Sequence, residues 1–406
     1  MSSALSTICN QLGKSKVEKP KLDMADIFRF HGHKLGILSW QKQKVVKAIT
    51  ECRTAALGGH IYECDRCDNR EQSYNSCRNR HCIKCQFAAK REWVEERAAD
   101  LLPVCYYHVV FTIPHEFNEL ILTNKKAIYD ILFRASSETL KEVFKRKYQA
   151  DPGMIAVLHT WGQNLSLHPH IHMVIPGGGL ADGDSRWVHT DEKFFLNVRA
   201  LGSVFRAKFI KMMRSAYNKG QLKFLDINEH LADRPAFQDL LDSTFKQDWN
   251  VYAKKPFQNP MHVLKYLGGY THRIAFANHR LLEFDEKTVR FKVRDRQAEK
   301  EGKSASTEMT LPTVEFMRRF LLHVVPRGFM RIRHYGILGS SRKKTALEAA
   351  RKLLPESHDK GTKSVAEMVA EFAAASPVTS DDCQKCKAGK MLPIETIMPV
   401  KITDST

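Results

Sequence analysis

The sequence lacks the features of a membrane or secreted protein. It has no apolar run near the roughly 20 residues that span a bilayer, and its first residues carry scattered lysines, from Lys14 to Lys21, in place of a signal peptide's apolar core. Acidic residues are also scarce: 45 Asp and Glu against 64 Lys and Arg leave a formal net charge of +19. We therefore expect a soluble cytoplasmic protein with no membrane partner, whose surface favours a polyanion, nucleic acid first.

The cysteines are clustered in a chain of 406 residues, which is long enough for two or three domains. Two C-x2-C pairs, Cys64 with Cys67 and Cys82 with Cys85, stand fourteen residues apart. In a reducing compartment this spacing indicates metal rather than disulfides, and two pairs complete a tetrahedral zinc shell. We predict a structural Zn²⁺ site at these four cysteines. The surplus donors that could replace one ligand or bind a second ion are Cys77, His81 and His60.

A further C-x2-C pair, Cys383 with Cys386, has no obvious partner pair after it. A zinc site there needs donors from elsewhere in the chain, so we predict none.

The stretch 167–176 places one apolar residue between two histidines. In a strand, successive side chains alternate between faces, so Ile171 points into the core while His170 and His172 share the opposite face. Two neutral imidazoles can hold one divalent ion with positions left open for substrate. An isolated pair of this kind is more often two surface histidines, so the other motifs of the chain decide.

The order of elements predicts the fold class. We expect strands over 104–114 and 154–161, a helix over 116–149, helices over about 198–250, and two strands at 273–284 and 288–294. The short link from 161 to 167 makes 154–161 and the histidine strand antiparallel neighbours. This order predicts an α+β fold: one antiparallel sheet with helices on a face, as in split βαβ folds, plus an N-terminal zinc-ribbon-like module.

Two further groups of residues have a chemical interpretation beside an ordinary one. Tyr266 and Tyr270 share one face if their segment is helical, although such a pair usually serves packing. Arginines near the cysteines suit phosphate contacts, and those interleaved with aromatics after residue 326 suit single-stranded DNA, although a packed hairpin with a solvated basic edge fits as well. The predicted nucleic-acid-binding residues are Arg78, Arg80, Arg327, Arg331 and Arg333.

Taken in order, these motifs resemble a known family. The cysteine-rich stretch 74–82 precedes His-Thr-Trp-Gly-Gln at 159–163, the His-Pro-His-Ile-His strand, the Tyr-x3-Tyr segment and Arg-Gly-Phe-Met-Arg-Ile-Arg-His-Tyr-Gly at 327–336. Over about residues 25–345 the chain resembles the two-tyrosine rolling-circle transposases of bacterial insertion sequences, which belong to the HUH endonuclease superfamily and carry an N-terminal zinc-binding domain.

The resemblance implies a DNA transposase that nicks one strand, becomes joined to its 5′ phosphate and leaves a 3′ hydroxyl. It maps the catalytic nucleophiles onto Tyr266 and Tyr270, and the ligands of a catalytic Mg²⁺ or Mn²⁺ onto His170 and His172. A third polar ligand is expected, and we predict Gln163; His159, His168 and His262 stay open as candidates. The implied partner is DNA, mainly single-stranded transposon ends and target, and a homo-oligomer is compatible with it.

The predicted organisation is a mobile tail at 1–22, a zinc-binding DNA-recognition module at 23–100, the nuclease domain at 101–300, a basic DNA-binding extension at 301–354 and a C-terminal tail at 355–406. Two other functions compete. A zinc-ribbon DNA-binding regulator without catalysis explains the charge and the cysteines. A metal-dependent hydrolase that uses His170 and His172 with a water nucleophile explains the histidines.

Overall fold

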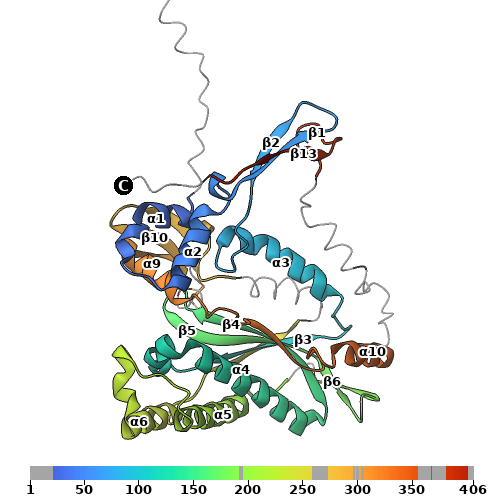
Figure 1. Cartoon of the computed structure of the whole chain (residues 1–406). Helices are drawn as coiled ribbons and strands as arrows, with labels where there is room; N and C mark the ends of the chain where they lie inside the picture. Colours follow the sequence, from blue (N-terminus) through green and yellow to red (C-terminus); the bar gives the residue numbers. More distant parts are fainter. Residues whose placement is uncertain are drawn as a thin grey trace, which may run out of the picture.

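The computed structural model describes residues 22–191, 195–257, 273–295, 298, 301–302, 306–354, 367 and 381–400. Its centre is a seven-stranded sheet in the order β7-β6-β4-β5-β3-β8, with β12 beside β4 (Figure 1). Every strand pairing in this sheet is antiparallel. The strands are β3 (Tyr106–Thr112), β4 (Asp151–Trp161), β5 (Leu167–Pro176), β6 (Gly178–Ala181), β7 (Arg186–His189), β8 (Val251–Phe257) and β12 (Ile332–Gly336).

Helices cover one face of this sheet. They are α4 (Asn118–Tyr148), α5 (Val198–Asn218) and α6 (Arg234–Phe245) (Figure 1). The apolar residues of α5 recur at helical spacing, so Phe205, Phe209 and Met213 all point into the main core. They pack against alternate residues of the central strands, such as Phe111 and Ile171. The predicted α+β class and the antiparallel pairing of β4 with β5 are confirmed.

A second core joins the N-terminal helices to the residues on both sides of position 300. It contains α1 (Met24–His31), α2 (Trp40–Glu51), α9 (Thr313–Leu322) and the sheet of β9 (Leu281–Phe284), β10 (Thr288–Arg294) and β11 (Ser306–Pro312). The pairing of β10 with β11 crosses the boundary predicted between residues 300 and 301. Residues 306–324 therefore pack with the N-terminal helices, while β12 and α10 (Lys343–Leu353) pack with the central sheet.

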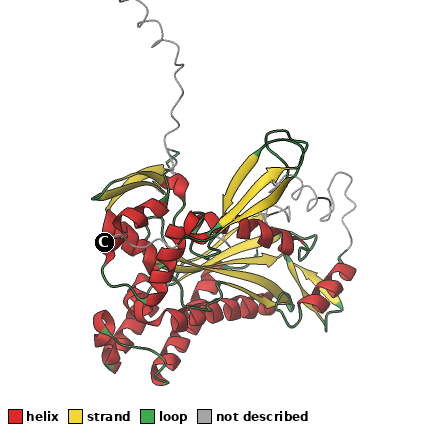
Figure 2. Cartoon of the chain, turned by 45° about the horizontal axis from the view of Figure 1, so that its top comes forward, coloured by secondary structure: helices red, strands yellow, loops and turns green. Residues whose placement is uncertain are grey.

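The N-terminal module includes a segment from the other end of the chain. Strands β1 (Gly59–Cys64), β2 (Arg70–Tyr74) and β13 (Met391–Ile397) form a three-stranded sheet that projects from the rest of the molecule (Figures 1 and 2). Helix α3 (Ile83–Ala98) follows it and lies over the central sheet. The C-terminal tail predicted from residue 355 is corrected here, because β13 pairs with the whole of β1.

Short 3₁₀ helices complete the described elements: η1 (Gly32–Leu35), η2 (Ala55–Leu57), η3 (His115–Phe117), η4 (Asp226–Ala232) and η5 (Asn278–Arg280). Within the described residues, no helix is long and apolar enough to cross a membrane.

Candidate functional site

Three histidines converge on the face of the central sheet opposite α4 and α5. His159 in β4 is the direct cross-strand partner of His170 in β5, and His172 lies two residues further along the same face. Their ligand nitrogens all lie within 4.8 Å of one another. Ile171 between them is fully buried in the main core, which confirms the predicted alternation. Three imidazoles this close suit one divalent ion.

The tautomer of His170 is fixed by the backbone. Its Nδ1 lies 2.7 Å from the carbonyl oxygen of His168. A carbonyl oxygen only accepts, so Nδ1 carries the proton and Nε2 keeps its lone pair. A ring held through Nδ1 with a lone pair on Nε2 is the form in which histidine binds a metal.

His172 is held by a fourth histidine. Its Nδ1 lies 2.9 Å from Nε2 of His108 in β3, and the two rings stack with centroids 5.1 Å apart. Burial lowers the pKa of His108 to about 4 and that of His172 well below its ordinary value, so both rings are neutral at neutral pH. When His172 donates from Nδ1, its Nε2 presents a lone pair to the three-histidine group.

The structure favours His159 as the third ligand over Gln163, the residue predicted from the sequence. His159 is buried and stacks on Trp161, with ring centroids 4.5 Å apart. Gln163 lies in the turn between β4 and β5, where its backbone carbonyl oxygen accepts a hydrogen bond from Arg280 at 2.6 Å. The remaining candidate ligands are His168, which is exposed, and His262, which lies outside the described residues.

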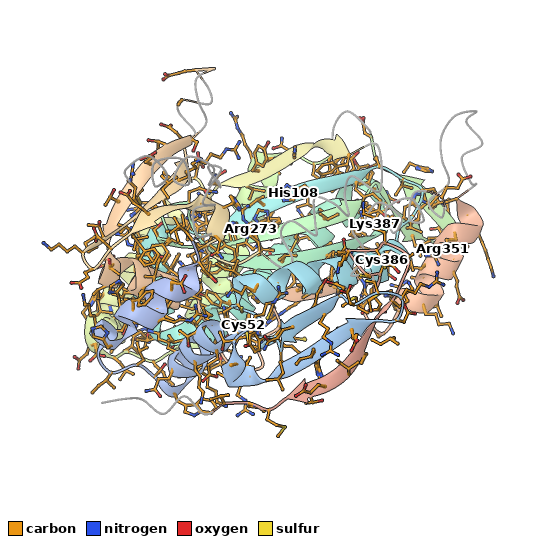
Figure 3. All side chains as sticks on the ribbon, turned by 90° about the horizontal axis from the view of Figure 1, so that it is seen from above. Cys52, His108, Arg273, Arg351, Cys386 and Lys387 are labelled. Atoms are coloured by element: carbon orange, nitrogen blue, oxygen red, sulfur yellow. The ribbon has the colours of Figure 1, made fainter. Side chains whose placement is uncertain are left out.

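The predicted nucleophiles Tyr266 and Tyr270 lie outside the described residues, which resume at Arg273. Burial and the neighbouring histidines lower the pKa of His172 most, and the charge of Arg273 lowers this pKa further. Figure 3 shows Arg273 and His108 over the same part of the sheet. A guanidinium beside a metal site suits a phosphate group.

The four cysteines predicted for one zinc site lie in two separate clusters, which corrects that prediction. The first, here called the N-terminal cluster, consists of Cys52, Cys77, Cys82 and Cys85. Cys85 Sγ lies 3.6 Å from both Cys52 Sγ and Cys77 Sγ. Hydrogen bonding with the Cys77 thiol lowers the pKa of Cys52, which favours a thiolate. Cys52 had no signal in the sequence because it stands alone, before the first C-x2-C pair.

The second, here called the bridging cluster, consists of Cys64, Cys67, Cys383 and Cys386. The partner of the C-terminal pair is therefore the first pair of the chain. Neither His60 nor His81 belongs to a cluster of metal-ligating groups in the part of the chain that the structure describes.

The predicted DNA-binding arginines differ in what they contact. Arg78 and Arg327 are exposed. Arg80 donates a hydrogen bond to the backbone carbonyl oxygen of Phe329 at 2.5 Å. Phe329 itself is buried in the main core, so its ring cannot stack on a DNA base.

The other two arginines are held within the protein. Arg333 forms an ion pair with Asp130 at 2.5 Å and lies over the Phe133 ring, 4.1 Å from its centroid. Burial lowers the pKa of Arg331 to about 10. These contacts within the protein agree with a packed segment after residue 326 rather than with an open surface for single-stranded DNA.

A polar surface pocket adjoins the N-terminal cluster. Its lining includes Arg53, Tyr74, Asn75 and Arg78. Arg53 directly follows Cys52, and Arg78 directly follows Cys77. Both arginines have a positive φ, 58° and 51°, so the turns at two cluster cysteines aim both exposed side chains at this pocket. Two guanidinium groups fixed in this way suit a phosphate backbone.

Comparisons with known proteins place two transposase families along the chain. Residues 26–113 match the family described as "Transposase zinc-binding domain", and residues 153–345 match the one described as "Putative transposase". The chain is 42% identical over 381 residues to "Putative transposase y4qJ" of Sinorhizobium fredii, covering 92% of this chain and 95% of that protein. It is 26% identical over 313 residues to "Transposase for insertion sequence element IS801" of Pseudomonas savastanoi pv. phaseolicola, covering 75% and 72%. No solved structure matches.

Proposed function

This chain belongs to the two-tyrosine rolling-circle transposases of bacterial insertion sequences, and from that premise we propose that it nicks and rejoins single-stranded DNA through a tyrosine bound to the 5′ phosphate. The observation that carries the proposal is the group of His159, His170 and His172, whose ligand nitrogens lie within 4.8 Å of one another. A regulator that only binds DNA has no use for three converging imidazoles on its central sheet, two of them oriented by hydrogen bonds.

Residues of this chain fit a catalytic cation. His170 is oriented by the carbonyl of His168, and His172 by His108, so both rings are positioned before any ion binds. A divalent ion held there, Mg²⁺ or Mn²⁺, supplies Lewis acidity that polarises the scissile phosphate.

The nucleophile in this proposal is the hydroxyl of Tyr266 or Tyr270. The phenol gives up its proton and its oxygen attacks phosphorus, and the bond from phosphorus to the 3′ oxygen breaks, leaving a 3′ hydroxyl. Because one phosphoester replaces another, rejoining needs no ATP. Tyr270 precedes Arg273 by three residues, which span at most about 11 Å, and the charge of Arg273 already acts on His172. Two tyrosines permit two successive strand exchanges at one site.

The N-terminal module supplies a structural zinc site and a DNA contact. The sulfur separations of 3.6 Å in the N-terminal cluster fit a tetrahedral zinc–thiolate site, in which metal–sulfur bonds of about 2.3 Å place sulfurs about 3.8 Å apart. Zinc bound by these cysteines would fix the turns that carry Arg53 and Arg78, so we expect the DNA contact to depend on the metal. Arg327 is a further exposed candidate.

The test is incubation of the purified protein with labelled single-stranded DNA, followed by a denaturing gel. The proposal predicts a protein–DNA adduct that survives denaturation and is lost in His170→Ala. A regulator without catalysis would leave the DNA intact. A hydrolase that activates water would cut the DNA over many turnovers without forming an adduct.

A further inference from the structure

The bridging cluster lies outside the site proposed above, and half of its ligands lie outside both matched families, which end at residues 113 and 345. We propose that Cys64, Cys67, Cys383 and Cys386 form a second structural zinc site, which fastens the C-terminal segment 381–400 to the N-terminal module.

The separations between sulfurs support zinc. Cys64 Sγ lies 3.7 Å from Cys386 Sγ, and Cys67 Sγ lies 3.6 Å from Cys383 Sγ. All four sulfurs lie within 4.8 Å of one another. These values are close to the edge of about 3.8 Å expected for a zinc–thiolate tetrahedron. They are far from the S–S bond of about 2.05 Å in a disulfide, so the arrangement is that of four ligands around one centre.

The surrounding backbone is built for thiolates. The amide of Arg66 donates to Cys64 Sγ at 3.4 Å, and the amide of Gly389 donates to Cys386 Sγ at 3.3 Å. One cysteine of each pair thus receives a hydrogen bond from a backbone amide two or three residues later in the chain. A side-chain donor, Nδ2 of Asn69, lies 3.5 Å from Cys383 Sγ. Donors directed at sulfur stabilise its charged form.

Gly389, which follows the C-terminal cysteine pair, packs directly against Cys64 of the first pair. A Cβ at this position would lie 2.4 Å from Cys64 Sγ and 2.6 Å from a carboxylate oxygen of Asp65. The turn after Cys386 therefore approaches the first pair as closely as backbone atoms allow. This contact joins residues far apart in the sequence and has no purpose in a loose tail.

Packing alone gives this end of the module little stability. Among the described residues, its buried apolar cluster contains only Cys64, Cys383 and Met391, with Tyr62 and the other two cysteines partly buried around it. Outward-facing residues of β13, such as Leu392, are half exposed. A three-stranded sheet with so small a core needs another source of stability, and a tetrathiolate zinc supplies it in small domains.

The two cysteine clusters lie at opposite ends of the sheet β13-β1-β2. Cys64 ends β1, whereas the N-terminal cluster adjoins the start of β1 and the end of β2, where the amide of Arg53 donates to the carbonyl oxygen of Asn75. Figure 3 shows Cys52 and Cys386 at the two ends of these strands. The module is therefore fastened at both ends.

The experiment counts zinc per chain by native mass spectrometry, in a His170→Ala background so that metal on the three histidines is not counted. The two four-cysteine clusters predict two zinc ions per chain. Cys383→Ser should leave one ion, Cys82→Ser should also leave one, and Cys105→Ser, a control outside both clusters, should leave both. One ion in the parent protein, or two in Cys383→Ser, would overturn the proposal, as would disulfides within this cluster in the native protein.

A second variant covers the case in which a serine variant fails to fold. Gly389→Ala keeps every thiol but pushes a methyl group against Cys64 Sγ. In competition with a chelator, one of the two ions should leave faster than in the parent, and hydrogen exchange should rise in β13 and β1 while the start of α3 is unchanged. Equal release of both ions in Gly389→Ala and the parent would refute the site. None of these results depends on nicking activity.

Discussion

Nε2 of His108 in β3 lies 2.9 Å from Nδ1 of His172 in β5, so a neighbouring strand orients one ring of the three-histidine group. Removing this contact should weaken metal binding more than it lowers the nicking rate at saturating metal. For His108→Ala we predict that the Mn²⁺ concentration needed for half-maximal nicking rises by about 10-fold or more. This is the usual effect of losing a residue that supports a metal ligand. The measurement is the nicking rate as a function of Mn²⁺ concentration.

Two further variants separate positioning from general damage. His108→Gln offers an oxygen that can accept from Nδ1 of His172, so it should restore part of the lost affinity. His115→Ala removes a ring that is 85% exposed and should change nothing. An unaltered Mn²⁺ dependence in His108→Ala would show that His108 has no such role.

The donor set predicts a preference among cations. His159, His170 and His172 offer only imidazole nitrogens, whereas Mg²⁺ prefers oxygen ligands. We therefore expect Mn²⁺ to support nicking at lower concentrations than Mg²⁺, and a chelator to stop nicking until Mn²⁺ is restored. The check is the rate of nicking across both titrations at constant ionic strength. A lower requirement for Mg²⁺ would argue for oxygen ligands such as Gln163.

The pocket beside the N-terminal cluster predicts a phosphate contact. Replacing Arg53 and Arg78 by Ala should weaken binding to all DNA sequences alike and reduce the slope of log affinity against log salt by about 2, because each lost phosphate contact removes about one unit. The melting temperature should stay unchanged, since both side chains are exposed. A full salt slope in the double variant would place the DNA elsewhere.

Arg333 should behave in the opposite way. It forms an ion pair with Asp130 and lies over the Phe133 ring. The side chains of Arg333 and Asp130 are each less than one-third exposed. Arg333→Ala should lower the free energy of unfolding by about 1–2 kcal/mol and leave the salt slope of DNA binding unchanged. Chemical denaturation measures the first quantity. A reduced salt slope without loss of stability would make Arg333 a DNA contact after all.

His323 predicts a pH dependence of stability. Burial lowers its pKa from 6.5 to about 4, and its neutral ring is bound by Thr160 at 3.2 Å and by the carbonyl oxygen of Leu165 at 3.1 Å. Between pH 6.5 and 4 the unfolded chain therefore binds more protons at this residue than the folded one. Stability is complete above pH 6.5 and falls as the pH drops, with a slope of at most about 1.4 kcal/mol per pH unit.

The matching variant is His323→Gln, which cannot be protonated in this range. Its free energy of unfolding should depend less steeply on pH between 6.5 and 4 than that of the parent, and the difference isolates His323 from the other buried histidines. Identical slopes would show that His323 does not titrate differently on unfolding.

The sequence predicted what depends on local patterns and missed what depends on pairing. Alternation within one strand was enough to place Ile171 in the core and His170 and His172 on the opposite face. His108 joins them only through the register of β3 against β5, which no single strand specifies. Likewise His159 is brought to His170 by the register of β4, which spacing cannot show.

The prediction of one zinc site from the cysteine spacing was wrong for a related reason. The spacing of two C-x2-C pairs predicts that each pair contributes to a metal shell, and each does lie in a cluster. Spacing does not show which pairs meet, because that follows from long-range contacts such as the pairing of β13 with β1. Cys64 and Cys67 therefore meet a pair more than 300 residues later in the chain, as the numbering of Cys383 shows.

In the proposed reaction, a tyrosine of this chain becomes joined to the 5′ phosphate of nicked DNA. The most direct test is to trap the adduct with Mn²⁺ and single-stranded DNA, digest it with nuclease and protease, and identify the modified residue by mass spectrometry. We expect a nucleotide attached through its 5′ phosphate to Tyr266 or Tyr270, and no adduct from the Tyr266→Phe, Tyr270→Phe double variant. An adduct on another residue, or an undiminished adduct in the double variant, would contradict it.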